Sequence, residues 1–386
     1  MSHETRTLAE FIATTRFNDL PRGVVHEAQR HILDTLGAAV SGSTSESAEA
    51  TRRATAHLSG TGDCTVIGRR ARSNPFNAAL TNGTAAYSTL MDDFYSSRGF
   101  VHPGNHVIPA ALAMGEHLSS SGAALITAVV VGYEVSCRVA DAVGDSQDEM
   151  GLYMGSTNPH FGSAATAASL LNLDGERVCH ALGLAGAQAS GIKERGLVMN
   201  ISQAFHAGHA ASSGVLSGIL AAEGLCAGDT VFEGANGYLA VFSRGADARQ
   251  LVDGLGTAFR IGQVGFKLYP AAAPIAASID AAIALQRQHH LQPSMIDAVT
   301  VRTHSMSLRA HDRPNASERL EALRSTQYCV ARGLIYGQLS PSDFDAEKLA
   351  DPAVRALMPR VHMAVDSEMD RIAPQRYGSR VLVHTT

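Results

Sequence analysis

The segment HAGHAASSGVLSGILAAEG, residues 206–224, decides the class of fold that the sequence predicts. Alanine, glycine and serine recur in it at intervals of three and four residues. The segment HFGSAATAASLL, residues 160–171, has the same composition. Small residues at helical spacing let helix backbones approach closely, so both segments predict a tightly packed helical core. Packing alone is enough to explain this composition.

Helical patterns extend through the first 260 residues. In segment 24–41 the apolar residues fall on one helical face, and glycine and serine then provide a stop signal. The same periodicity predicts further helices at 76–91, 107–119, 121–142, 162–171, 175–189, 206–224 and 228–233.

Beyond residue 260 the composition changes. Segment 259–270, FRIGQVGFKLYP, is punctuated by glycine and ends in proline. Alternation and β-branched residues predict a strand in MIDAVTVRTHS, 295–305, after a helix at 276–288. A long helix at 316–339 and two strands, in 360–369 and 379–386, are expected to follow.

The predicted fold class is therefore mostly α. A large all-helical domain, residues 1–260, precedes a smaller α+β domain, residues 261–386. The chain stops at SRVLVHTT, within the last expected strand. Either the protein ends there naturally or a terminal segment is absent.

The composition excludes several classes of protein. The 386 residues are 45% hydrophobic and 17% charged, with a net charge of −5, which is typical of a globular protein of two domains. No basic block interleaved with aromatic residues occurs, so neither nucleic acid nor an anionic membrane is expected as a partner. The apolar run 123–131 is short for a membrane span, and the N-terminus has no signal-peptide pattern. Five scattered cysteines without CxxC predict neither disulfides nor a zinc site, so a cytoplasmic location is expected.

Ionisable residues are concentrated in MDDFYSSRGFVHPGNHVIPAALAMGE, residues 91–116. Asp92 and His102 lie ten residues apart around a polar loop, and Pro103-Gly104 separates His102 from a helix expected to begin near Val107. An aspartate beside a histidine fixes the imidazole tautomer, which suits general acid–base catalysis. The alternative is that the aspartate caps a helix and that His102 is solvated.

The same loop also contains the ligand types of a metal site. Asp92, Asp93, His102 and His106 are close in sequence, but the intervening Pro-Gly disfavours a shared helical face for the two histidines. No HExxH motif, phosphate-binding glycine motif or GxSxG elbow is present. We therefore expect no metal, no nucleotide cofactor and no serine hydrolase.

Three further segments place polar side chains beside apolar helices. Segment 151–165 offers Tyr153, Asn158 and His160. Segment 191–211 carries the charged residues Lys193, Glu194 and Arg195 before a helix opened by His206 and His209. Cations near a helix N-terminus can hold an anion, although a solvated charged loop is the alternative. In FKLYP, a partly desolvated Lys267 can act as a base or bind a carboxylate.

These segments, in this order, resemble the MmgE/PrpD family, which contains 2-methylcitrate dehydratase, cis-aconitate decarboxylase and iminodisuccinate epimerase. The resemblance covers nearly the whole chain. It rests on the segments HILDTLGAAVSG, the 91–116 stretch, LDGERVCHALGLAGAQASG, FHAGHAASSGVLSGILAAEG, TVFEGANGYLAVF and FKLYP.

The resemblance implies a homodimer in which each chain has a helical domain, a smaller α+β domain and a cleft between them. It also implies chemistry on small di- and tricarboxylates without metal or organic cofactor. Asp92 and His102 match the family's loop aspartate and histidine. His206 matches the histidine of an LHxG turn, and Lys267 matches the lysine of K-x-x-P.

The chain departs from the family pattern in several places. Tyr153 stands where dehydratases and decarboxylases tend to carry a histidine, and Gln203 replaces a lysine. Segment 271–278, AAAPIAAS, lacks a further histidine or cysteine. The family's C-terminal segment, which returns to the helical domain, is missing after Thr386. These departures put 2-methylcitrate dehydration and cis-aconitate decarboxylation in doubt.

The sequence thus predicts a cofactor-independent lyase or isomerase that abstracts a proton next to a carboxylate of a small polycarboxylate. His102, oriented by Asp92, is one expected acid–base group, and Tyr153 or Lys267 is the other. The residues expected to bind substrate are Arg98, Lys193, Arg195, Gln203, His206 and His160. β-Elimination of the hydro-lyase type and epimerisation both remain open. The alternative from another class is a non-catalytic carboxylate-binding protein.

Overall fold

The computed structural model describes residues 3–58, 62–194 and 201–386. The chain divides into two compact units, Met1–Phe266 and Lys267–Thr386. The first is helical apart from two short strand pairs, and the second combines helices with a small sheet. The predicted fold class, mostly α with a smaller mixed unit, is confirmed.

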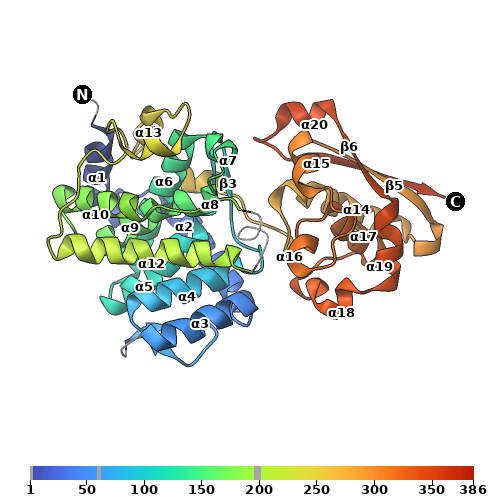
Figure 1. Ribbon diagram of the computed structural model, residues 1–386, viewed down its shortest axis with the longest axis horizontal. Coiled ribbons are helices and arrows are strands. Elements are labelled where there is room, and N and C mark those ends of the chain that lie inside the picture. The colour runs from blue at the N-terminus through green and yellow to red at the C-terminus, as the bar shows by residue number, and fades with distance from the viewer. Residues whose placement is uncertain (1–2, 59–61, 195–200) are drawn as a thin grey trace. The chain divides into compact units, whose positions relative to one another are not determined.

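Helix α12 (Gln203–Ala222) lies at the centre of the first unit. It packs against α4 (Pro75–Tyr87), α9 (Pro159–Leu170) and α10 (Gly175–Gln188), as Figure 1 shows. Around these helices lie α1 (Glu4–Thr14), α2 (Arg22–Gly42), α3 (Glu46–Leu58), α5 (Gly104–His117) and α6 (Gly122–Val143). The short helices α7 (Ser146–Glu149), α8 (Met154–Thr157) and α13 (Tyr238–Phe242) complete the unit.

Small residues explain how closely these helices pack. A Cβ added at Gly83 of α4 would lie 2.8 Å from the Cα of Gly208 in α12. A Cβ at Gly214 would collide with Ser163 of α9. The backbone of α12 therefore approaches α4 and α9 at positions where only glycine fits. The spacing of small residues in the sequence predicted such close packing.

Helix α6 is long and apolar enough, by length and composition, to cross a membrane. The apolar run was expected to be too short for this, but the helix continues past Glu134 to Val143. Within its most apolar window 78% of the residues are buried in the unit. Glu134 and Arg138 form an ion pair on it, with 2.7 Å between Oε1 and Nε, and neither side chain is exposed. These are features of the core helix of a globular unit.

Two predicted helices are absent or divided in the structure, and a third, expected to begin near Val107, begins at Gly104 as α5. Residues 228–233 form a loop that ends in a turn at 231–233, because the amides of Gly234 and Gly237 bond back within the loop and α13 begins only at Tyr238. The predicted helix 316–339 is divided into α16 (Arg319–Ala322) and α17 (Thr326–Tyr336). Ser325 causes the break, since its Oγ accepts from the Tyr328 amide at 3.1 Å and caps α17.

The second unit contains a three-stranded sheet in the order β6-β5-β7, and the three expected strands are confirmed. Strand β5 (Ile296–Thr303) is parallel to β6 (Val361–Val365) and antiparallel to β7 (Ser379–Thr385). Helix α14 (Ala276–His289) packs against α17 and β7. The remaining helices are α15 (Ser305–His311), α18 (Ala346–Leu349), α19 (Pro352–Leu357) and α20 (Ser367–Ile372).

Candidate active site

A short hairpin brings the predicted aspartate and histidine together. Strand β3 (Tyr95–Ser96) pairs antiparallel with β4 (Phe100–Val101), and Tyr95 faces Val101. Because Asp92 and Asp93 precede β3 and His102 follows β4, the pairing places them side by side. Asp92 and His102, ten residues apart in the sequence, are thus in direct contact.

The surroundings of His102 define which ring nitrogen carries the proton. Its Nδ1 lies 2.8 Å from Oδ2 of Asp92 and 2.7 Å from the carbonyl oxygen of Asp93. Both neighbours are acceptors, so Nδ1 is the protonated nitrogen and Nε2 carries the lone pair of the neutral ring. Within the described ranges Nε2 has no hydrogen-bond partner, and the side chain is 11% exposed. His102 is therefore arranged as a base through Nε2.

Asp92 is itself held in place. It is fully buried, and its Oδ2 accepts from Nδ2 of Asn105 at 3.2 Å. The adjacent Asp93 has a different environment. Its carboxylate accepts from the Tyr133 hydroxyl at 2.6 Å and the Gly104 amide at 2.8 Å, and fixes the start of α5. Burial, reinforced by the charge of Asp93, holds the pKa of Tyr133 well above its usual range.

A hydroxyl–amide network lies next to His102. The hydroxyls of Tyr87 and Tyr153 are 2.7 Å apart, and Nε2 of Gln203 donates to them at 3.0 and 2.9 Å. The Tyr87 ring is 5.4 Å from the His102 ring, centroid to centroid. Tyr87, Tyr153 and Gln203 come from α4, the start of α8 and α12. The fold thus joins side chains that are far apart in sequence into one polar surface.

Tyr87 is the residue that the sequence reasoning missed. It lies in the last turn of α4 and is 4% exposed, so it read as one more residue of a buried helix. The available signal was its position, because the turn that follows leads directly into the loop of Asp92 and His102. A tyrosine at the end of a helix beside a polar loop can present its hydroxyl to that loop.

Three histidines extend the network along α9 and α12. The His206 ring is 5.1 Å from Tyr153, and the His160 ring meets His209 edge-on at 5.1 Å. His160 is fully buried, and neither ring nitrogen has a hydrogen-bond partner in the described part of the chain. Burial lowers the pKa of His160 well below its ordinary value. Nowhere in residues 3–58, 62–194 and 201–386 do histidine, cysteine or carboxylate side chains group in a way that could hold a metal ion.

Two further predicted site residues, Arg98 and Lys193, have other partners in the structure. Arg98 is exposed and donates through Nε to the Asp141 carbonyl at 3.3 Å. The Lys193 ammonium is paired with Asp148 at the surface. Arg195 lies outside the described residues. Lys267 is the first residue of the second unit and is 8% exposed.

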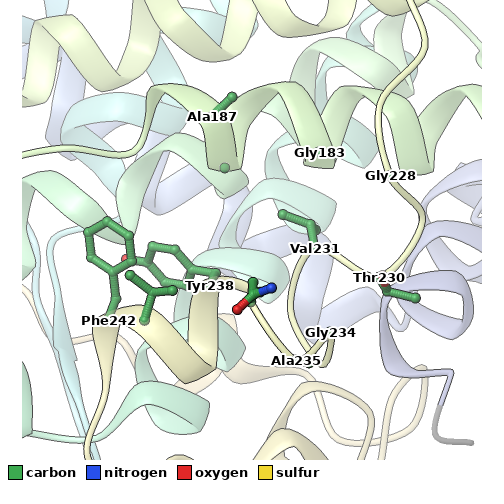
Figure 2. Close-up of a pocket in the computed structure, with 13 residues that line it drawn as sticks. Gly183, Ala187, Gly228, Thr230, Val231, Gly234, Ala235, Tyr238 and Phe242 are labelled. Carbon is green, nitrogen blue, oxygen red and sulfur yellow. The ribbon is translucent and has the colours of Figure 1, made fainter.

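A separate groove of about 580 Å³ is lined by α10, by the loop between α12 and α13, and by α13 itself. Figure 2 shows Tyr238, Phe242 and Val231 on one side and Gly183 and Ala187 on α10. None of the predicted site residues lines it. The Tyr238 hydroxyl donates to Oδ1 of Asn158 at 2.8 Å, so its aromatic wall is anchored to the start of α9.

Fold and site together define a two-unit, mostly helical protein with a histidine–aspartate pair suited to proton transfer. Residues 6–251 match the MmgE/PrpD N-terminal domain and residues 269–386 match the MmgE/PrpD C-terminal domain. The chain belongs to the MmgE/PrpD family, as its sequence segments indicated.

Its curated relatives include several cis-aconitate decarboxylases. The cis-aconitate decarboxylase-like protein oryM of Aspergillus oryzae is 28% identical over 98% of this chain and 83% of its own length. Cis-aconitate decarboxylase of Aspergillus terreus is 29% identical over 74% of this chain, which spans 60% of that relative. The Homo sapiens enzyme of the same name is 27% identical over 93% of this chain and 76% of its own length. These matches support an enzyme with lyase-type activity.

Proposed function

We propose that this protein is a cofactor-independent lyase that moves a proton at the carbon next to a carboxylate of a small di- or tricarboxylate. The observation that carries the proposal is the environment of His102. Two acceptors hold the Nδ1 proton, and Nε2 is left as the basic atom. A base in this state is what proton abstraction from carbon needs.

The neighbouring hydroxyl–amide network has a role in the same reaction. Removing a proton next to a carboxylate places negative charge on the carboxylate oxygens. The Tyr87 and Tyr153 hydroxyls lie 2.7 Å apart, so one donates to the other, and Gln203 donates to both. A single phenol proton of this preorganised pair can therefore donate to the enolate-like state while His102 holds the abstracted proton.

The fate of that proton distinguishes the reactions of this class. In a hydro-lyase reaction, His102 takes the proton, and the hydroxyl on the adjacent carbon leaves as water after it receives a proton from an acid. In a decarboxylation such as that of cis-aconitate, the substrate named in the relatives, protonated His102 gives a proton to the carbon skeleton as carbon dioxide departs. Both reactions use the same nitrogen.

Epimerisation is the second candidate, and Tyr153 favours it. A phenol hydroxyl in reach of the same network is a second group that can carry a proton. If His102 and Tyr153 address opposite faces of one carbon, the proton removed by one is replaced by the other. This reaction needs no leaving group.

Proton NMR in deuterium oxide tests these reactions together. The purified protein is incubated with citrate, 2-methylcitrate, cis-aconitate, the tartrate isomers and the iminodisuccinate isomers. A new vinyl signal supports a lyase, and deuterium entering an intact skeleton supports the epimerase. If the folded protein changes none of these acids, the proposal is wrong and a carboxylate-binding role becomes the better explanation.

Two histidine variants connect the activity to the site. His102→Gln is expected to abolish turnover and leave the fold intact, because the side chain borders solvent. The matched control is His180→Gln on α10, whose Nδ1 faces the Ala227 carbonyl at 2.9 Å, away from the network. Equal activity in both variants would remove His102 from the mechanism.

A further inference from the structure

The histidines of α9 and α12 are arranged in a way that the proposed chemistry does not use. His206 and His209 are three residues apart on α12 and so lie on one face of that helix. His160, in the first turn of α9, meets His209 edge-on. We call His160, His206 and His209 the histidine cluster.

His160 is the central member of this cluster. A neutral imidazole always carries one N–H donor and one acceptor nitrogen. In the described residues both nitrogens of His160 lack a partner, although the side chain is fully buried. A buried donor left without an acceptor destabilises the folded protein by about 1–3 kcal/mol. A bound ligand that accepts a hydrogen bond from His160 would remove this cost.

The cluster is continuous with the proposed site. The His206 ring is 5.1 Å from Tyr153, whose hydroxyl belongs to the network beside His102. His209 is only half-buried, so the cluster is not sealed from its surroundings. A small polycarboxylate has at least one carboxylate besides the one at the reacting carbon, and that second carboxylate needs partners.

The charge state of the cluster makes it responsive to an anion. Burial lowers the pKa of His160 well below its ordinary value, with neighbouring histidines adding to the effect. Burial also lowers the pKa of His206 and of His209. Among the described residues, the contacts place three polar groups near the cluster: His106 of α5, Tyr153 just before α8, and Tyr87 of α4 through its bond to Tyr153. The neighbouring His209, His106 and His206 disfavour a proton on His160, whereas a bound carboxylate would favour one.

We propose that His160, His206 and His209 form a carboxylate-binding subsite that takes up a proton when a small polycarboxylate binds. This rests on the proposed function, since it assigns a second carboxylate of the same substrate. The proton comes from solvent and protonates one imidazole. The carboxylate then accepts N–H hydrogen bonds from a cationic partner, a stronger interaction than with a neutral one.

Calorimetry of the full chain measures this proton directly. Citrate and cis-aconitate are titrated at pH 7 in two buffers of different ionisation enthalpy, and the difference in apparent binding enthalpy gives the protons taken up. We expect uptake of about one proton, and therefore affinity that weakens about tenfold for each pH unit above neutrality. Binding without proton uptake would overturn the subsite.

Variants and labelled histidine locate the proton. His160→Gln and His209→Gln are expected to abolish the uptake, whereas His180→Gln keeps it. Nitrogen-15 histidine NMR of the unchanged protein covers the case in which His160→Gln does not fold. A ring of the cluster should move from its neutral to its imidazolium signal when citrate is added, and unchanged signals with citrate bound would contradict the proposal.

The subsite and the lyase can fail separately. Proton uptake without turnover in the deuterium oxide assay would support the subsite and overturn the lyase. Turnover without proton uptake would overturn the subsite alone. If no acid of the panel binds, both proposals are wrong.

Discussion

Asp92 and Asp93 are adjacent in sequence and have different partners. Asp92 faces Nδ1 of His102 and the Asn105 amide, both of which belong to the site. Asp93 accepts from Tyr133 and Gly104 and lies 2.8 Å from Nδ1 of His31, and all three partners belong to the buried frame of the unit. One carboxylate therefore orients a reacting group, and the next one stabilises the fold.

Asp92→Asn is expected to lower kcat by a factor of about 10²–10⁴. Asparagine has the same shape and can keep an oxygen toward His102, so the tautomer survives. The negative charge that stabilises protonated His102 is lost. The test measures kcat with the acid that reacts in the deuterium oxide assay. The midpoint of urea unfolding is measured on the same variant. A large stability loss with unchanged kcat would mean that Asp92 is structural.

Asp93→Asn serves as the matched comparison, because the change is the same and the position differs by one residue. Its new amide group would face either the Gly104 amide or the Tyr133 hydroxyl, which shares Oδ2 with the His31 ring, and a buried donor would lose its acceptor. We expect a loss of about 1–3 kcal/mol in the free energy of unfolding. An Asp93 variant as stable as the unchanged protein would contradict this assignment.

At the residue scale, sequence reasoning succeeded where contacts are local. Asp92 and His102 are ten residues apart on one hairpin, so a short loop is enough to join them. Tyr87 and His209 reach the site only through helix packing, which the local sequence pattern does not determine. Packing also determined that the Lys193 charge, which looked available, is paired with Asp148.

At the scale of elements, the crossing of α4 and α12 positions Gln203 and the two histidines of α12. A Cβ at Gly208 would collide with the Leu80 carbonyl and the Thr84 hydroxyl of α4. The small-residue spacing in residues 206–224 predicted this close approach. It could not predict which face of α12 meets α4, since small residues occur all around the helix.

Gly208→Ala is expected to destabilise the first unit by about 1–3 kcal/mol, because α12 must move away from α4. Activity should fall as well, since Gln203 lies on the displaced helix. Gly37→Ala on α2 is the control: that glycine is exposed with open space around it, and alanine favours a helix by about 0.5–1 kcal/mol. Urea unfolding followed by circular dichroism compares the two. Equal midpoints would show that α12 tolerates the shift.

At the scale of the whole molecule, composition and periodicity predicted two kinds of unit, one helical and one α+β. The helical unit was accessible because its apolar and small residues repeat at helical spacing over long segments. The second unit was harder, because its long expected helix is interrupted at Ser325, a capping residue within an apolar run. Neither composition nor periodicity contains information about the pKa of a buried group, because that pKa depends on packing.

Buried histidines give the first unit a pH dependence. Burial lowers the pKa of His106 to about 3, and it lowers the pKa of His160, His206 and His209 in the same direction. An unfolded histidine takes up a proton near pH 6.5, whereas these folded ones take it up only at a lower pH. Above that pH both states are neutral and the histidines contribute nothing. Below it the unfolded state binds more protons, so stability falls as the pH falls.

We expect the free energy of unfolding to decrease by roughly 1 kcal/mol per pH unit for each histidine that remains neutral below pH 6.5. Hydrogen exchange at pH 7.5, 6.5 and 5.5 would locate the effect in peptides from α9 and α12, which carry three of these side chains. His106→Gln removes one such group and should make the dependence shallower, whereas His180→Gln should leave it unchanged. Stability that stays constant or rises on acidification would mean that the buried histidines find proton partners that their packing does not provide.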